Sequence, residues 1–306
     1  MSNTFAGMTF TNIAQRGLEV LSKRLLGLNI FTTDFSGDVI QGTKVQTRII
    51  PASSAPVAKS TLAYNDATIL AGETTTEVEV ELSRRYVAGF ELTDDEMAKI
   101  GAGVMNDTKD KMIEKKVNAL ADEMLTYVFS LITSISYTHA FSAVAAVAAD
   151  YDDLIDWRTT LAKANFPIQD TALVMNPDFI GAFLKDKTIA QLNSSGIAAV
   201  TDGAGAMVRL AGMRPYEAVS LPTNSQKLAG FACLPDCLAI AMRGLPAPDS
   251  GVPTERIEIL TDPQTGATMT YYAYRDSDYR RWVHTFETYY GAKKANASNL
   301  YRIVTP

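Results

Sequence analysis

The histidines are the first residues to consider for chemistry, because the sequence has only two, His139 and His284. A Ser–His–Asp triad needs a histidine beside an activated nucleophile, and the nucleophile-elbow motif G-x-S-x-G does not occur. His284 shares one row of a strand pattern with Trp282 and Phe286. We therefore predict a half-buried strand histidine at this position and not an acid–base catalyst.

The two cysteines, Cys233 and Cys237, are spaced C-x3-C. A structural zinc site needs four ligands, and the sequence supplies neither a nearby histidine nor a second cysteine pair. We predict core thiols that bind no metal and form no disulfide. Two cysteines in a chain of 306 residues also exclude a disulfide-rich scaffold, and they fit a reducing compartment.

Glycine-rich and acidic stretches give no stronger signal. The stretch from Gly203 to Gly205 lacks the third glycine of a dinucleotide-binding loop, and the phosphate loop G-x4-GK[ST] does not occur. Neighbouring carboxylates occur at Asp152, Asp153 and Asp156, and at Asp276 and Asp278. A solvated helix face and a turn explain these carboxylates better than a paired acid and base. We therefore predict no catalytic site, no cofactor and no metal.

Composition limits the class of protein. The net charge is 28 − 34 = −6, and cationic residues are not clustered, so non-specific nucleic-acid binding is disfavoured. A hydrophobic content of 47% supports a sizeable core and argues against disorder. The apolar stretches are too short and broken to span a bilayer, and the N-terminus lacks a signal-peptide pattern. We expect a soluble, cytoplasmic protein.

The element that organises the chain is a long predicted strand, Thr74 to Leu92. Its residues alternate between an apolar row and a polar row, and Arg84 is the one charge in the apolar row. From Thr76 to Leu92 such a strand would span ~56 Å, about the diameter of the whole globule. A second strand, Val39 to Ile50, precedes it, and Pro51 to Glu73 has no clear period. We predict a two-stranded arm whose apolar row is covered by another copy of the chain.

Helical periodicity flanks this arm. Ile13 to Leu28 is amphipathic, and it could pack on the core or reach a neighbouring subunit. Thr93 and Glu96 form a capping-box pattern that starts a short helix. A long helix is predicted from about Val104 to Ile132, ~44 Å in length, as a spine against which a sheet packs.

Strands and helices alternate over residues 149–245, which indicates a second, α/β domain. The predicted elements are a helix at Asp152–Ala164, a strand at Thr171–Met175, a helix at Phe179–Lys185, a strand or hairpin at Met207–Leu221, a strand at Leu228–Ala232 and a short helix near Cys237–Arg243. Four later strands are expected to join the spine helix, at Arg256–Leu260, Met269–Tyr274, Trp282–Tyr290 and Leu300–Val304. The α/β domain would then be an insertion.

This order of elements resembles the major capsid (coat) protein of tailed bacteriophages, whose fold is shared with the herpesvirus capsid floor. Several stretches are similar to one branch of that family, including FELTDDEMAKIG, ADEMLTYVFSLI, TTLAKANFPIQDTALVMNPDFIGAFLKD, LAGMRPYEAVSLP, GFACLPDCLAIAMRGLP and DPQTGATMTYYAYRDSDYRRWVHTFETYYGAKKANASNLYRI. The likeness covers most of the chain from about Val39 onward, and it contains no chemical motif.

The resemblance implies an α+β fold, the tailed-phage major-capsid fold. Its parts would be an N-terminal arm (1–36), an extended-loop hairpin (37–92), a peripheral domain with the spine helix (93–148), an axial α/β domain (149–245) and a C-terminal sheet that returns to the peripheral domain (246–306). The peripheral domain would contain an antiparallel sheet. The axial domain would surround five- and six-fold axes, and the hairpin would lie over a neighbouring subunit.

The implied function is self-assembly into the icosahedral shell that encloses the genome of a tailed bacteriophage. Expected contacts between subunits lie at Lys59, Tyr64, Val78, Val80, Leu82, Arg84, Leu18 and Leu25. Arg84 could meet a carboxylate of an adjacent subunit, or it could sit where the arm leaves the body with its head in water.

The implied partners are further copies of this chain in pentamers and hexamers, a separate scaffolding protein and a portal. Packaged DNA would be enclosed without sequence-specific binding, which suits the acidic balance, and no membrane is involved. The protein would reside in the virion after assembly in the host cytoplasm. Two alternatives remain open: a bacterial nanocompartment shell protein of similar fold, which would enclose proteins, and an enzyme of unknown type.

Overall fold

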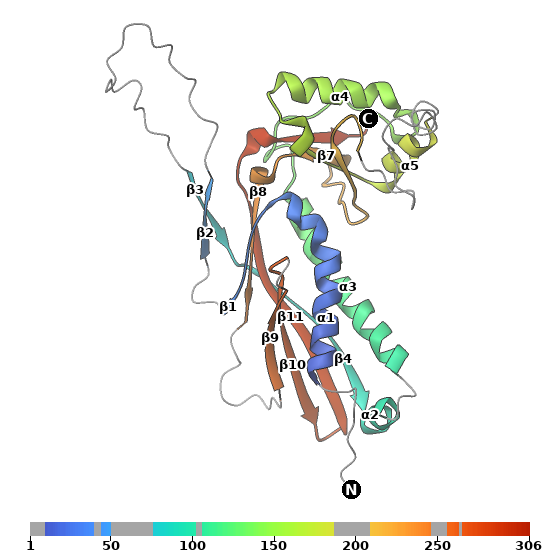
Figure 1. The fold of residues 1–306 in the computed structure, drawn as a ribbon, viewed down its shortest axis with the longest axis vertical. Coiled ribbons are helices and arrows are strands. Elements are labelled where there is room, and N and C mark those ends of the chain that lie inside the picture. Colours follow the sequence, from blue (N-terminus) through green and yellow to red (C-terminus); the bar gives the residue numbers. More distant parts are fainter. Residues whose placement is uncertain are drawn as a thin grey trace, which may run out of the picture.

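A computed structural model describes residues 10–39, 44–49, 76–101, 106–186, 209–245, 256–262 and 265–306. The molecule is elongated, with a lower body built on a large sheet and an upper body built on a small sheet (Figure 1). A two-stranded arm base lies beside the large sheet. The arm tip, Pro51 to Glu73, is outside the described residues.

The large sheet has six strands, and most of its strand pairs are antiparallel. Its order is β1 (Thr32–Val39), β8 (Leu238–Gly244), β11 (Arg281–Lys294), β10 (Thr268–Asp276) and β9 (Arg256–Thr261), and β4 (Arg84–Thr93) also pairs with β11. β1 is parallel to β8. The mixture of helices with largely antiparallel sheets confirms the predicted α+β class.

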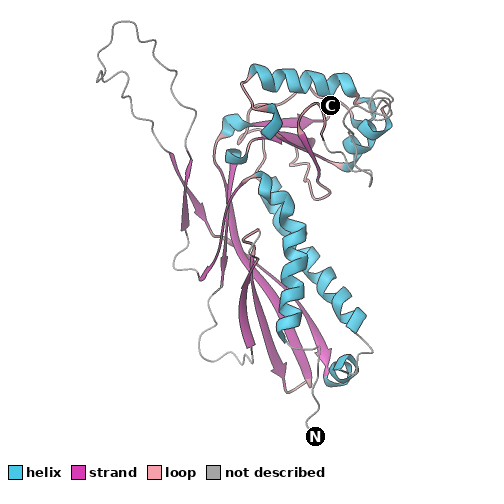
Figure 2. Ribbon diagram, viewed as in Figure 1, coloured by secondary structure: helices cyan, strands magenta, loops and turns pink. Residues whose placement is uncertain are grey.

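Two long helices cover one face of the large sheet (Figure 2). They are α1 (Phe10–Leu25), which continues into η1 (Leu26–Ile30), and α3 (Asn106–Ser130). Arg24 of α1 binds Asp122 of α3 at 2.8 Å, and Arg16 binds Glu114 two turns earlier, so the helices run parallel. The described part of the N-terminal helix therefore packs on the core, which decides between the two alternatives that its periodicity left open.

The spine helix α3 confirms its predicted periodicity. Its apolar row is buried, namely Ile113, Val117, Leu120, Met124 and Val128. This row belongs to one core with Met269, Tyr271, Phe286 and Tyr290 of the large sheet. The short helix α2 (Asp94–Gly101) starts with the predicted capping box, because Thr93 N–H donates to Glu96 Oε2 at 2.8 Å and Glu96 N–H donates to Thr93 Oγ1 at 3.3 Å.

The small sheet has four strands in the order β12 (Leu300–Val304), β7 (Leu228–Cys233), β5 (Ala172–Met175) and β6 (Arg214–Glu217). One face packs on α4 (Tyr151–Lys163) and α5 (Pro177–Lys185), and the other faces the lower body through Val174 and Phe231. The α/β character predicted for this region is present, although the last strand was expected to join the large sheet and is found here instead.

The predicted short helix near Cys237–Arg243 is wrong, since these residues form β8. The residues from Leu238 to Met242 are all buried, because β8 is covered by the helices on one face and by the arm base on the other. A strand buried on both faces shows no alternation, and its sequence does not distinguish it from a buried helix.

The predicted long strand is also divided. It consists of β3 (Thr76–Glu81), which pairs with β2 (Lys44–Ile49) in the arm base, and β4, which pairs with β11 in the large sheet. The ladder is interrupted at Leu82 and Ser83. The upstream strand is divided as well, because β1 ends at Val39 and β2 begins at Lys44.

Candidate assembly surfaces

The arm base is held by the subunit itself. The side chains of Val78 and Val80 on β3, and of Leu82 directly after it, are buried against Ala239 and Ala241 of β8. Alternate residues of β8 face α1 and α3, so the arm base packs on the opposite face of the large sheet. The expected contact of these three side chains with a neighbouring subunit is therefore wrong, because their own sheet covers them.

The arm crosses the sheet at Gly291 of β11. A Cβ atom at this position would lie 2.0 Å from the carbonyl oxygen of Glu81 and 3.2 Å from Cα of Leu82. Only glycine allows two backbones to approach so closely. The interruption between β3 and β4 lies at this crossing, which fixes the point at which the arm leaves the body.

Arg84 is the first residue after this crossing. Its side chain is exposed, and its guanidinium lies over the ring of Tyr127 in α3 at 4.9 Å from the ring centroid. The rings of Tyr127 and Tyr290 are in turn packed in a T-shaped arrangement, with their centroids 5.6 Å apart. Arg84 thus holds its charge over an aromatic ring at the surface, where the arm leaves the body. A contact with an adjacent subunit stays a prediction.

The other predicted contact residues lie in three different environments. Leu25 is buried in the core of the subunit, so its expected contact with a neighbour is wrong. Leu18 is half-buried and packs against the same core. Lys59 and Tyr64 are outside the described residues.

The joint between the two bodies contains a buried cation, Arg302 of β12. Its Nε donates to the carbonyl of Tyr137 at 2.8 Å, and its Nη1 donates to Gln226 Oε1 at 3.4 Å. Burial lowers the pKa of Arg302 from its usual value.

Nearby, the amide of Asn224 donates to the carbonyls of Phe129 and Ile132 at the end of α3, at 3.0 and 2.7 Å. Side chains of the upper body therefore terminate the spine helix and fix it to the small sheet.

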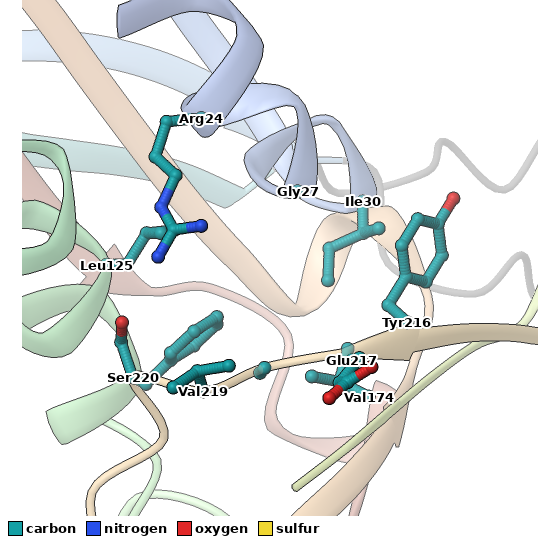
Figure 3. Close-up of a pocket in the computed structure, with 11 residues that line it drawn as sticks. Arg24, Gly27, Ile30, Leu125, Val174, Tyr216, Glu217, Val219 and Ser220 are labelled. Atoms are coloured by element: carbon teal, nitrogen blue, oxygen red, sulfur yellow. The ribbon is translucent and has the colours of Figure 1, made fainter. Parts of the chain in front are cut away.

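A cavity of about 240 Å³ lies at the same joint, between η1, α3, β5 and β6 (Figure 3). Its wall is largely apolar, with Ile30, Leu125 and Val174. Arg24 reaches across it, but this guanidinium is engaged by Asp122. The lining residues include neither histidine nor cysteine.

The histidines and cysteines, which the sequence offers as candidates for chemistry, are buried or stacked against neighbouring side chains. His284 is fully buried, more than predicted, and its Nδ1 lies 2.6 Å from the hydroxyl of Tyr271. Burial lowers the pKa of His284 to about 4, so the ring is neutral at pH 7. Both cysteines are buried as free thiols, and burial raises the pKa of Cys237. His139 stacks on Tyr301 with centroids 4.9 Å apart.

Within the described ranges, no cluster of three His, Cys, Asp or Glu side chains could hold a metal ion. No helix in the same ranges is long and apolar enough to cross a membrane. Sequence reasoning missed Gly291, Asn224 and Arg302. A glycine inside the pattern of a central strand was the one available signal, because it often marks a close approach of another backbone.

Of the comparisons with known proteins, the one with solved structures finds similar chains. No protein-family model matches the chain, and no curated protein matches it in sequence. The capsid structure of cyanophage P-SCSP1u is similar to it with a TM-score of 0.55 at 12% identity, and covers 92% of this chain and 88% of that chain. A chain from Mycobacterium phage Che8 has a TM-score of 0.52 at 15% identity, covering 99% and 93%.

A virus-like particle from Pyrococcus furiosus is similar as well, with a TM-score of 0.54 at 12% identity and coverage of 96% and 98%. These alignments include both bodies and nearly the whole length of each chain. At such low identity they establish the arrangement of the backbone and not a common activity. The chain therefore has the fold of tailed-phage major capsid proteins.

Proposed function

We propose that this protein is the major capsid protein of a tailed bacteriophage, which self-assembles into the icosahedral shell around the genome. The observation that carries the proposal is the match to a phage capsid chain over 92% of the length, at a TM-score of 0.55. A partial match would indicate a shared domain, whereas this one includes both bodies and their connection.

The chemistry of the subunit supports a structural role. In the described part of the chain the two histidines have aromatic or hydroxyl packing partners, both cysteines are buried, and no cluster of three His, Cys, Asp or Glu side chains could hold a metal ion. The net charge of −6 suits a shell that encloses DNA without binding its phosphates. The partners in this proposal are further copies of the chain in pentamers and hexamers, a scaffolding protein and a portal. Assembly would take place in the host cytoplasm, and the mature protein would reside in the virion.

A protein-storage compartment of similar fold is the alternative that the sequence left open, and these similarities do not favour it over the capsid. Both candidates predict closed shells, so electron microscopy of the purified protein tests them together. A strictly monomeric protein at high concentration, with and without a scaffolding partner, would contradict both. The nucleic-acid content of native particles after nuclease treatment separates the two, because a viral capsid protects DNA and a storage compartment protects protein.

A further inference from the structure

One edge of the large sheet has no described strand beside it. β4 pairs with β11 from Arg84 opposite Tyr290 to Thr93 opposite Arg281, and it has no second strand partner among the described residues. Figure 1 shows β4 along the border of the sheet, beyond β11. Such an edge presents backbone N–H and C=O groups that can pair with a further strand.

The residues of this edge are arranged symmetrically about Ala88. Arg85 lies three residues before Ala88 and Glu91 three residues after it, and both point to the face away from α3. Val87 and Gly89 lie between them in the same row, and Val87 is 52% exposed. On the other face, Tyr86 and Phe90 flank Ala88 in the same way. The strand is therefore complementary to itself when it is reversed.

We propose that β4 pairs antiparallel with β4 of a second copy of this chain, about a twofold axis that passes through Ala88. In this register Arg85 lies opposite the partner's Glu91, Tyr86 opposite the partner's Phe90, and Val87 opposite the partner's Gly89. The large sheet then continues across the two copies with each face preserved.

Charges already paired inside each subunit extend across this contact. Arg85 binds Glu287 at 2.8 Å, and Glu91 binds Arg281. The proposed register adds an Arg85–Glu91 contact between the copies. Four neighbouring strands, β11 and β4 of one copy and β4 and β11 of the other, would then carry Glu287, Arg85, Glu91 and Arg281, so the sign of the charge alternates from strand to strand. Opposite charges directly across a strand pair stabilise it, and like charges destabilise it.

Charged side chains on an edge strand usually prevent it from pairing with another strand. Here the two signs are equally far from the centre, so the reversed strand meets its opposite charge. A shift by two residues would place Arg85 opposite Gly89 and Glu91 opposite Ser83, and would lose both contacts. The proposal rests on the shell function, because an icosahedral shell of identical subunits contains twofold axes, and the contact across each such axis is isologous.

The first test uses a single new cysteine. In the Ala88→Cys variant the two introduced thiols lie directly opposite, at a separation that a disulfide can bridge. Mild oxidation of assembled particles, or of concentrated subunits if no particles form, should shift most of the 33.2 kDa chain to twice its mass on a non-reducing gel. The native thiols are buried, so the parent protein should stay monomeric on the gel.

Val87→Cys is the matched control for the register. In the proposed pairing each thiol introduced by this substitution lies opposite Gly89 of the partner subunit. The corresponding thiol of the second copy is diagonal to it, ~7–8 Å away and beyond the reach of a disulfide. Cross-linking of Ala88→Cys but not of Val87→Cys supports the proposal. Cross-linking of Val87→Cys alone, or of neither variant, overturns it.

The second test exchanges charges between copies. Arg85→Glu alone or Glu91→Arg alone would place like charges opposite each other at both ends of the contact, and assembly should be lost. An equimolar mixture of the two variants restores opposite charges at both ends of every mixed pair, so particles should return. Mixing leaves the disturbed pairs with Glu287 and Arg281 inside each subunit unchanged, and recovery therefore reports the contact between copies.

The outcomes separate this inference from the shell function. Particles that form without an Ala88→Cys cross-link leave the shell function standing and overturn the β4 contact. A cross-link in concentrated subunits without any particles supports the contact and contradicts the shell. Failure of the mixture to recover, when thermal unfolding shows both variants folded, overturns the Arg85–Glu91 register.

Discussion

The close approach at Gly291 leads to a quantitative prediction for Gly291→Ala. The added methyl group would lie 2.0 Å from the Glu81 carbonyl oxygen and 2.8 Å from the Glu81 carbonyl carbon. A carbon atom normally stays ~3.3–3.6 Å from a carbonyl oxygen, so one backbone must move by roughly 1.3–1.6 Å. Both atoms belong to the backbone, and no side-chain rotation can relieve the contact.

The cost depends on how β3 responds. A small displacement that keeps the arm base in place is a case of overpacking and costs about 1–3 kcal/mol. A displacement that lifts β3 from the sheet exposes Val80 and Leu82, which are 0% and 2% exposed in the parent subunit. Exposure of these two side chains costs about 1.5–3 kcal/mol each, or about 3–6 kcal/mol together. We expect destabilisation within these limits, concentrated in the arm base.

The assay is urea unfolding combined with hydrogen exchange of the subunit. Gly291→Ala should lower the free energy of unfolding and should remove amide protection from β2 and β3, while α3 keeps its protection. Gly181→Ala is the matched control, because no atom lies within 4 Å of the added methyl group and the position is inside a helix. That variant should be more stable than the parent by about 0.5–1 kcal/mol. An unchanged stability of Gly291→Ala, with full protection of β2 and β3, would refute the crossing argument.

Three further predictions concern single residues. Arg302→Ala should destabilise the subunit by about 1–3 kcal/mol in urea unfolding, because the buried carbonyl of Tyr137 and the amide oxygen of Gln226 each lose a donor. If the free energy of unfolding falls no more than it does when an exposed arginine is replaced by alanine, the joint does not depend on Arg302. The folded-state pKa of His284 is about 4, below its usual value of 6.5, so the stability that the neutral ring maintains is present above pH 6.5 and is lost as pH falls from 6.5 towards 4. The free energy of unfolding should fall by about 1.4 kcal/mol for each pH unit in this range, and this fall should be absent from His284→Phe. A parent protein whose stability is constant over this range would contradict the assignment. Arg84→Ala should change thermal unfolding little, because an exposed cation–π contact contributes only about 0.5–1 kcal/mol, and should raise the protein concentration needed for assembly; assembly at the parent's concentration would leave Arg84 a purely local role.

The parts of the fold that the sequence predicts well are those with a strong local period. The spine helix shows its row every three or four residues, and the capping box at Thr93 marks the start of α2 through a contact between residues three apart. Both depend on neighbours in the sequence, so both were found. The arm base was found for the same reason, because alternation in β3 reflects one covered face.

The failures depend on residues far along the chain. Alternation continues through Leu82 and Ser83, and the interruption there reflects a close approach to Gly291, which lies more than two hundred positions later. The sequence of β8 predicts a helix instead of a strand, because both faces of this strand are covered and its residues show no alternation. The apolar row of the arm predicts a cover from a neighbouring subunit, because the sequence does not reveal that Ala239 and Ala241 of the same chain pack against it.

The joint between the two bodies also has a mechanical consequence. Within the described residues the chain passes between the bodies at three places, from α3 to α4, from β7 to β8 and from β11 to β12. A force that pulls the bodies apart is therefore carried by covalent backbone in parallel, and not by one flexible linker. Two of these connections are short and join strands directly, because β7 is followed by β8 of the large sheet and β12 is preceded by β11. A wall built from such subunits would resist tension through its covalent chains, and it would yield first at the contacts between subunits.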